Sequence, residues 1–294
     1  MTPPPVRGST SRSLLSSGHG LDRLAPWFRR CLRLCLCLIL LAACGSESAD
    51  SVTITGSTSV TPFAEHLAEL YQKQHSGMVI NIQGLGSSAG IRAAIDGVAE
   101  IGMSSRELKP EETEQLDQVV IAHDALALIV HPTNPISDVS SEQIKGIFSG
   151  AIRSWADVGG PPQPIVLVSR EAGSGTFGAF EDLVMKGTPI TTAAMRQGSN
   201  GAIRQIVGED PNAIGYISLG IVDPTVKALS IDGVRAATSN VEAGQYKLVR
   251  PFLFVWRKGR QLSPLASSFV EYVMSPEGQQ ELVNAGLVQG EARR

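Results

Sequence analysis

Short apolar runs alternate with helically spaced apolar residues along most of the chain after residue 50. The apolar run over 165–168 predicts a buried strand, and residues 177–185 read as a helix. Two earlier units begin in the same order, with strands over 52–55 and 78–82 that each lead through a polar loop into a helix. This alternation predicts an α/β architecture with mostly parallel sheets.

Other elements follow from capping and turn signals. Pro62 with Thr61 as its N-cap predicts a helix that continues to about Gln74. Ser140 and Gln143 have the spacing of a capping box and open a helix that ends near Gly150. We also expect helices over 91–96, 202–207 and from 276 to about 286, a short strand within 101–106, and strands over 119–122, 126–130, 214–217 and 248–255.

The first 44 residues read as a targeting segment. Three arginines, Arg29, Arg30 and Arg33, precede an uninterrupted run of ten apolar residues. Ten residues are too few to span a bilayer, but they suit the core of a signal peptide. The string Leu41-Ala42-Ala43-Cys44 resembles a bacterial lipobox, after which Cys44 would be the lipidated N-terminus. We therefore expect a signal peptide over 1–43 and a tether over 44–50, with a plain secretory signal as the alternative.

Cysteine use and charge narrow the possible functions. All four cysteines lie within the first 44 residues, so the rest of the chain has no disulfide and no cysteine metal site. The leader carries six of the 25 Lys and Arg residues and one of the 28 Asp and Glu residues. The remainder has a net charge of about −8, which does not attract nucleic acid. The histidines are scattered without metal-ligand spacing, and we expect no metal and no cofactor.

Three loops share one design, in which Gly and Ser or Thr residues join a strand to a helix N-terminus. They begin at Gly56, Gly84 and Arg170. Such loops present unpaired backbone N–H groups, and their glycines let an anion approach the main chain. Arg170 adds a planar guanidinium that is always charged. Since ligands of open α/β sheets bind beyond the carboxyl ends of the strands, we expect the loops to surround a tetrahedral anion.

An enzyme is the alternative from a different class. No phosphate-binding Gly-x-x-x-x-Gly-Lys-Ser/Thr loop is present. Residues 86–90 match Gly-x-Ser-x-Gly between a strand and a helix, which is the context of a serine-hydrolase nucleophile at Ser88. Few strands precede this loop, and the later histidines, His123 and His131, are poor partners. The same loop design also recurs where no hydrolase explanation applies, so we expect a binding protein rather than an enzyme.

Several motifs come in an order that resembles the phosphate-binding proteins of the Pst-type ABC transporter. They are Thr55–Ser59, Gly84–Gly90, Ile101–Arg106, Arg170–Thr176, Ala213–Tyr216 and Ser275–Gln279. The resemblance implies a type II periplasmic-binding-protein fold, in which two α/β lobes are joined by two crossing strands and close on the ligand. The crossings would lie near 126–131 and 248–254. Lobe one would be 51–130 plus 249–294, and lobe two 131–248.

The resemblance also implies a site, a ligand and partners. The ligand would be inorganic phosphate, delivered to permease subunits of an ABC transporter by a monomeric receptor on the periplasmic face of the envelope. Either Ser87 or Ser88 would serve from the second loop. The implied phosphate-binding residues are Ser57, Thr58, Ser59, Ser87, Ser88, Ser105, Arg170, Ser174, Gly175 and Thr176.

One position departs from the family. Many members have Asp where this chain has Ser105, and that carboxylate accepts a proton from hydrogen phosphate. Fully ionised sulfate has no proton to share and is rejected by a carboxylate, whereas a serine hydroxyl can donate or accept. Glu171 could replace the missing carboxylate. Receptors for sulfate, molybdate or tungstate therefore stay open as alternatives.

Overall fold

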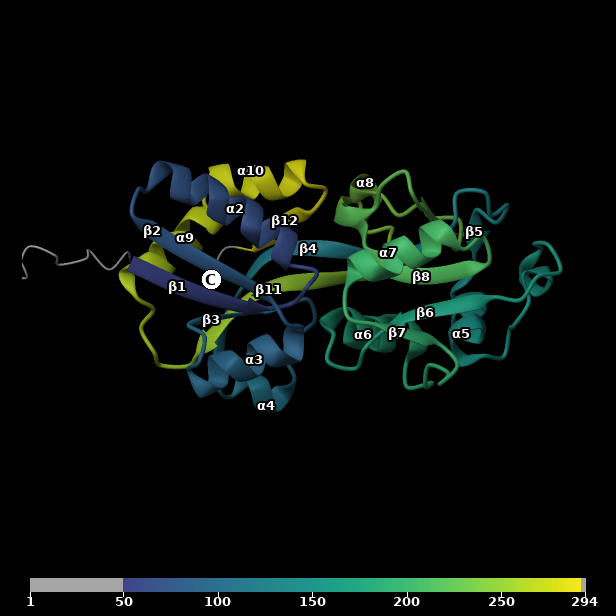
Figure 1. The fold of residues 1–294 in the computed structure, drawn as a ribbon, viewed down its shortest axis with the longest axis horizontal. Helices are drawn as coiled ribbons and strands as arrows, with labels where there is room; N and C mark the ends of the chain where they lie inside the picture. The colour runs from purple at the N-terminus through teal and green to yellow at the C-terminus, as the bar shows by residue number, and fades with distance from the viewer. Residues whose placement is uncertain (1–49, 292–294) are drawn as a thin grey trace, which may run out of the picture. The chain divides into compact units, whose positions relative to one another are not determined.

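The computed structural model describes residues 50–291, which form two α/β lobes joined by two strands (Figure 1). The predicted signal peptide, the lipobox and all but the last residue of the predicted tether lie outside the described residues. The main sheet has the strand order β2-β1-β3-β11-β4-β8-β6-β7 and runs through both lobes. The predicted α/β fold with two lobes and two crossing strands is confirmed.

Lobe one contains the early part of the chain and its C-terminal end. Helices α2, α9 and α10 lie on one side of its strands, and α3 and α4 lie on the other (Figure 1). Its elements are β1 (Asp50–Gly56), α2 (Thr61–Gln74), β2 (Met78–Gly84), α3 (Ser87–Asp96), β3 (Ile101–Ser104), α4 (Pro110–Thr113), α9 (Pro264–Met274), α10 (Pro276–Asn284) and β12 (Val288–Glu291).

Lobe two contains the middle of the chain, and β5 and β10 pair in a small separate sheet. Its strands are β5 (Asp138–Val139), β6 (Val166–Arg170), β7 (Met195–Gln197), β8 (Ala213–Ser218), β9 (Lys227–Ala228) and β10 (Ser230–Ile231). Its helices are α5 (Ser141–Ser149), η1 (Trp155–Val158), α6 (Gly175–Phe180), η2 (Glu181–Met185), α7 (Asn200–Glu209), η3 (Leu219–Ile221) and α8 (Thr238–Glu242).

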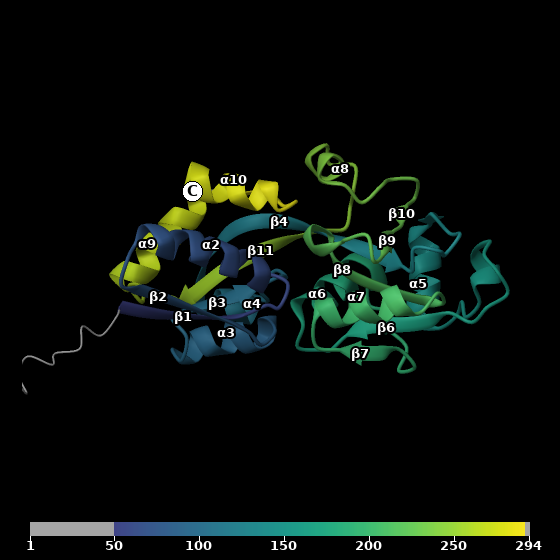
Figure 2. The same cartoon turned by 45° about the horizontal axis from the view of Figure 1, so that its top comes forward.

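The two connecting strands are β4 (Leu116–Val130) and β11 (Val249–Arg257), which pair with each other antiparallel. Figures 1 and 2 show both of them passing from the lobe with β1 to the lobe with β8. The separate strands predicted over 119–122 and 126–130 are wrong, because β4 is one continuous strand of 15 residues. Asp124, which lies between the two predicted segments, is buried and pairs with Arg250 in the sheet.

The prediction of mostly parallel sheets is only partly right. The strands toward each end of the main sheet pair in parallel, as β1 does with β2 and β3 and β6 does with β7 and β8. The crossing strands pair antiparallel with each other and with β3, β8, β9 and β12. Parallel strands need crossover connections, and helices supply these within each lobe. The chain enters lobe two along β4 and comes back to lobe one along β11, so these two strands are antiparallel.

Each lobe has its own apolar core. Along β4, Val119, Ile121 and Ala122 pack into the core of lobe one with Phe252, Phe254 and Phe269. From Ala125 onward the strand packs into the cores of lobe two. Burial of apolar surface in these cores therefore stabilises the two lobes, and β4 contributes to the cores of both. The lobe boundaries after residues 130 and 248 stay a prediction.

The predicted starts of α5 and α10 are confirmed, whereas α3, α6 and α7 begin four, two and two residues before the predicted positions. Ser140 and Gln143 form the expected capping box of α5, and the Oγ atom of Ser275 accepts from the backbone N–H of Gly278 at the start of α10. Thr61 as N-cap of α2 is wrong, because Val60 is the N-cap and the Thr61 hydroxyl donates to the Ser57 carbonyl. Within residues 50–291, no helix combines the length and apolarity needed to cross a bilayer.

Candidate anion site between the lobes

The loops predicted to converge do meet where the two lobes touch. Ser59, after β1, and Thr176, at the start of α6, have their hydroxyl oxygens 2.7 Å apart. The Oγ1 atom of Thr58 accepts a 2.9 Å hydrogen bond from Arg170 Nη2, and the Ser59 Oγ atom accepts a 2.7 Å bond from Asn200 Nδ2. The loops of both lobes thus share one buried cluster of hydroxyl, amide and guanidinium groups.

Arg170 is the charged centre of this cluster. It ends β6, and only 1% of its surface is exposed. Its guanidinium donates to the carbonyls of Gln197 and Gly198, to the hydroxyls of Thr58 and Thr176, and to Oδ1 of Asn200. All of these acceptors are neutral. Burial, together with the nearby Arg250, lowers the pKa of Arg170 to about 10, so the group keeps its charge at neutral pH.

A buried charge with only neutral partners is costly unless an opposite charge joins it. The two threonine hydroxyls that accept from Arg170 can turn to donate to an anion, and the guanidinium can then donate to the anion in their place. This arrangement of groups from both lobes therefore favours a small anion at the junction of the lobes.

Three buried serines of lobe one extend the cluster. The hydroxyl of Ser57 donates to Oγ of Ser105 at 2.8 Å, and Oγ of Ser87 accepts from the backbone N–H of Ser105 at 3.1 Å. The backbone N–H of Ser59 donates to Oγ of Ser57. These short hydroxyls come from the ends of β1 and β3 and the start of α3, as the loop design predicts.

The structure separates the two serines that the sequence left open. Ser87 is fully buried in the cluster, whereas Ser88 is exposed. The backbone N–H of Ser88 donates to the Gly173 carbonyl of lobe two at 3.2 Å. Ser88 thus lies at the rim of the lobe contact, while Ser87 supplies the inner hydroxyl.

The hydrolase alternative finds no support in the surroundings of Ser88. His66 contacts Glu281, His75 contacts Tyr71, and His131 contacts Thr133. His123 lies within β4, opposite Pro251 and Val288. No hydrogen bond described in residues 50–291 joins Ser88 to a histidine, so the base that a nucleophilic serine needs is not in place.

The start of α6 supplies close backbone approach more than free hydroxyls. Ser174 is its N-cap, and its Oγ atom accepts from the backbone N–H groups of Thr176 and Phe177. Gly175 packs so tightly against lobe one that an added Cβ would overlap the hydroxyl of Ser87 and crowd that of Ser105. A side chain at position 175 would therefore push the two lobes apart at this contact.

Asn200 is a site residue that the sequence analysis missed. It opens α7, is almost fully buried, and bridges Arg170 to Ser59. Residues 198–201 carry Gly and Ser ahead of a helix, which is the same signal as in the other three loops. Counting this loop with the others would have found the amide.

Tyr216 supports Arg170 through a hydrogen bond to its backbone. The Tyr216 hydroxyl accepts from the Arg170 backbone N–H at 3.3 Å and lies 2.8 Å from Oγ of Ser169. The Tyr216 ring stacks on Phe180, with 3.9 Å between the ring centroids. Burial raises the pKa of the Tyr216 hydroxyl, which therefore stays protonated at neutral pH.

No carboxylate hydrogen-bonds to the described part of the cluster. Glu171 is exposed, and the buried carboxylate of Asp124 is bonded to Arg250 and Ser218. Glu171 in the role of a proton acceptor is therefore not supported by its position. Among the residues that the structure describes, no group of His, Cys, Asp and Glu is arranged to hold a metal ion.

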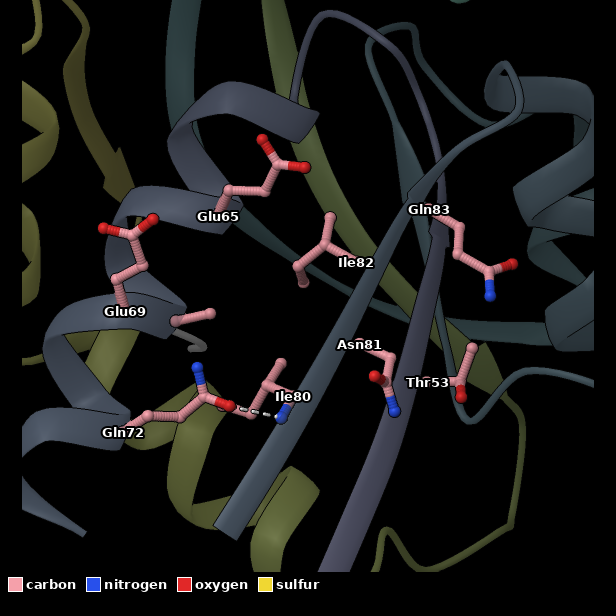
Figure 3. Close-up of a pocket in the computed structure, with 9 residues that line it drawn as sticks. Thr53, Glu65, Glu69, Gln72, Ile80, Asn81, Ile82 and Gln83 are labelled. Atoms are coloured by element: carbon pink, nitrogen blue, oxygen red, sulfur yellow. Dashed lines mark hydrogen bonds between the residues drawn. The ribbon is translucent and has the colours of Figure 1, made fainter. Parts of the chain in front are cut away.

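A depression lies on lobe one between α2 and the edge strand β2 (Figure 3). Glu65, Glu69 and Gln72 line it from the helix, and Oε1 of Gln72 accepts from the Ile80 backbone N–H at 2.8 Å. That bond satisfies part of the open sheet edge. The two carboxylates would repel an anion, so this groove is distinct from the site between the lobes.

Comparison with known proteins gives a consistent set of matches. A family model described as "PBP superfamily domain" matches residues 42–277. The phosphate-binding protein PstS of Bacillus subtilis is 31% identical over 249 residues, which cover 82% of this chain and 81% of that protein. The PstS protein of Pseudomonas aeruginosa is 28% identical, with 83% and 84% covered.

Solved structures agree with the sequence matches. A protein of Clostridium perfringens, described as a phosphate ABC transporter substrate-binding protein with bound phosphate, superposes with a TM-score of 0.79 at 43% identity. The match covers 82% of this chain and 99% of that one. An ABC-type phosphate transport receptor of Vibrio cholerae gives a TM-score of 0.69 at 35% identity, with 81% and 99% covered.

Proposed function

Because the chain belongs to the PBP superfamily, and within it to the family of the phosphate-binding proteins PstS, we propose that it is an extracytoplasmic phosphate receptor. It binds inorganic phosphate between its lobes and delivers it to the permease of an ABC transporter. It is a binding protein and not an enzyme. The names of the PstS relatives and the phosphate-bound structure of its Clostridium perfringens relative support this function.

The buried charge of Arg170 is the observation that carries the proposal. A guanidinium that is 1% exposed and bonded only to neutral acceptors matches a small dianion better than any neutral ligand. The surrounding hydroxyls add donors from both lobes. The anion therefore has its full set of contacts only when the cleft is shut, which couples binding to closure.

Each proposed binding residue has a distinct part. Arg170 supplies the charge, and Asn200 adds an amide that bridges the lobes. Ser88 and Ser174 stay in the proposed set through their main-chain positions, because the Ser88 side chain is exposed and the Ser174 hydroxyl caps a helix. The proposed hydroxyl and main-chain donors are Ser57, Thr58, Ser59, Ser87, Ser105, Gly175 and Thr176.

Phosphate is favoured over the other oxyanions by the relatives' names, since the cluster itself fits any tetrahedral anion of similar size. At Ser105 the site has a hydroxyl in place of the carboxylate that would accept a proton from hydrogen phosphate. Sulfate, molybdate and tungstate therefore stay the competing ligands.

We also propose that Cys44 carries the lipid anchor and that the receptor works as a monomer at the periplasmic face of the membrane. The Leu-Ala-Ala-Cys string supports the anchor. The acidic charge of the folded part leaves nucleic acid outside the proposed partners.

Calorimetry of residues 45–294 with phosphate, sulfate and molybdate in turn tests the function. The proposal expects saturable 1:1 binding of phosphate, with tighter binding than for molybdate. No phosphate binding, or binding of molybdate alone, would contradict it.

A further inference from the structure

A fully buried ion pair joins the two crossing strands beside the site. Asp124 on β4 and Arg250 on β11 stand directly opposite each other in the strand pairing. Nε and Nη2 of Arg250 donate to Oδ2 of Asp124 at 3.0 and 2.9 Å, and the two side chains are 1% and 0% exposed. A buried pair is weak evidence of stabilisation, because desolvation offsets much of the attraction. The position of the pair beside the site suggests a role other than stabilising the fold.

Arg250 reaches the proposed anion site through the main chain. Its Nη1 atom donates to the carbonyl of Ser105 at 3.3 Å, and its guanidinium lies 5.4 Å from the Phe252 ring centroid. The backbone N–H of Ser105 is bonded to Ser87, and its hydroxyl is bonded to Ser57. Ser105 is thus held at three atoms, two by site serines and one by Arg250.

Asp124 extends the same network into lobe two. Its Oδ1 atom accepts from the hydroxyl of Ser218 at 2.7 Å, and the backbone N–H of Leu219 also donates to the carboxylate. Ser218 ends β8, the strand that carries Tyr216 beneath Arg170. A continuous chain of hydrogen bonds therefore runs from Ser218 on β8, through the ion pair, to the Ser105 carbonyl in lobe one. It connects the strand that contains Tyr216 to the loop that contacts Ser57 and Ser87.

The strand ladder is irregular close to this pair. The register between β11 and β4 shifts between Phe252 and Leu253, which leaves Ile121 as an extra residue on β4. The Ile121 carbonyl accepts instead from Nε2 of Gln279. A bulge bends the strand and interrupts its hydrogen-bond ladder, so the ladder alone fixes the relative position of the two strands less firmly. The ion pair lies on the lobe-two side of the bulge, where it can fix the crossing strands relative to Ser105.

We propose that Asp124 and Arg250 are positioning residues of the anion site. They hold the Ser105 main chain, and with it the hydroxyls of Ser57 and Ser87, in position relative to Arg170 across the two crossing strands. Neither residue touches the anion. This inference rests on the proposed function, because its readout is phosphate affinity.

The test is calorimetry with inorganic phosphate on the mature chain and three variants. Arg250→Lys keeps the positive charge but cannot donate to both Asp124 and Ser105. Leu282→Ala removes a core side chain of lobe one, on α10, and serves as a control for lost stability. Ser218→Ala removes one bond to Asp124 with little change in volume, and it keeps the test possible where Arg250→Lys does not fold.

A positioning role predicts at least tenfold weaker phosphate binding in Arg250→Lys and more than threefold weaker binding in Ser218→Ala. Leu282→Ala should bind within threefold of the wild type despite a lower melting temperature. The inference is overturned where Arg250→Lys, or Ser218→Ala if it alone folds, binds within threefold of the wild type. It is also overturned where Leu282→Ala loses as much affinity as they do. A wild-type chain that does not bind phosphate would instead refute the proposed function itself.

Discussion

The hydroxyls of Ser59 and Thr176 lie 2.7 Å apart although the two residues belong to different lobes. Both side chains are buried, and Asn200 of lobe two donates to the same Ser59 oxygen. The lobes are therefore closed on one another at the site. Donors from both lobes therefore meet at one point, and an anion held there would contact both lobes at once.

Gly175 should control closure. Gly175→Ala is expected to weaken phosphate binding at least tenfold, about 1.4 kcal/mol, because the new Cβ meets Ser87 across the lobe contact. Gly173→Ala is the matched control, since a Cβ there has no atom within 4 Å and should leave affinity within threefold. Solution scattering on Gly175→Ala should show a larger radius with phosphate than the wild type. Equal affinity for both variants would mean that the lobes do not close on the ligand.

Selectivity against sulfate should be weak. The cluster offers hydroxyl and N–H groups but no described carboxylate, so nothing in it requires the proton that phosphate carries and sulfate lacks. We expect sulfate to compete with phosphate with an affinity within about a hundredfold, roughly 2.7 kcal/mol.

Ser105→Asp tests the cause of that weak selectivity. A carboxylate at this position should lower sulfate affinity more than phosphate affinity, because only phosphate can share a proton with it. Competition titrations on wild type and variant give both numbers. If sulfate fails to displace phosphate from the wild type even in thousandfold excess, a group other than residue 105 must accept the phosphate proton.

The pair of Arg106 and Glu112 should make stability depend on pH. Burial acts to raise the pKa of Glu112, but hydrogen bonds from Arg106 and the Lys109 backbone outweigh it and leave the pKa below its ordinary value of 4.5. A carboxyl whose pKa is lowered on folding stabilises the protein above the unfolded pKa. That contribution is lost as pH falls through the folded pKa.

Glu112→Gln should therefore reduce the free energy of unfolding by about 1.5 kcal/mol at pH 7. The difference from wild type should shrink below about pH 4. Urea unfolding at pH 7 and pH 3.5 measures both. An equal difference at the two pH values would mean that the carboxylate charge is not what Arg106 stabilises.

The lipid anchor is tested at the cysteine. Cys44→Ala should release the protein from the membrane fraction or stall it as an uncleaved precursor. Cys37→Ala is the control, because Cys37 lies outside the lipobox string and should leave processing unchanged. Unaltered membrane association of Cys44→Ala would rule out the lipobox.

Patterns within single segments predicted much of this fold. The alternation of apolar runs and the capping residues gave the order of strands and helices, because both depend on local geometry. Thr61 was misassigned because Ser57 offers its hydroxyl a carbonyl four residues back. The continuity of β4 was missed because the pairing that buries Asp124 comes from Arg250, which lies 126 residues away.

The candidate site was predictable where one loop contained its own signal. Glycines, hydroxyls and Arg170 stand together in the sequence, and the structure brings them together. The choice between Ser87 and Ser88 depends on how α3 is rotated against lobe two, which no local pattern contains. The pair of Asp124 and Arg250 depends on the register of two strands far apart in the chain.

The most direct test of the account is phosphate titration of Arg170→Ala beside Arg204→Ala. Arg204 lies on α7 of the same lobe and pairs with Asp223 away from the cluster. We predict that Arg170→Ala loses roughly 2–5 kcal/mol of binding free energy while its fold survives, because the buried anion loses its charged partner. Arg204→Ala should bind within threefold of the wild type. Phosphate affinity of Arg170→Ala within threefold of the wild type would contradict the central assignment.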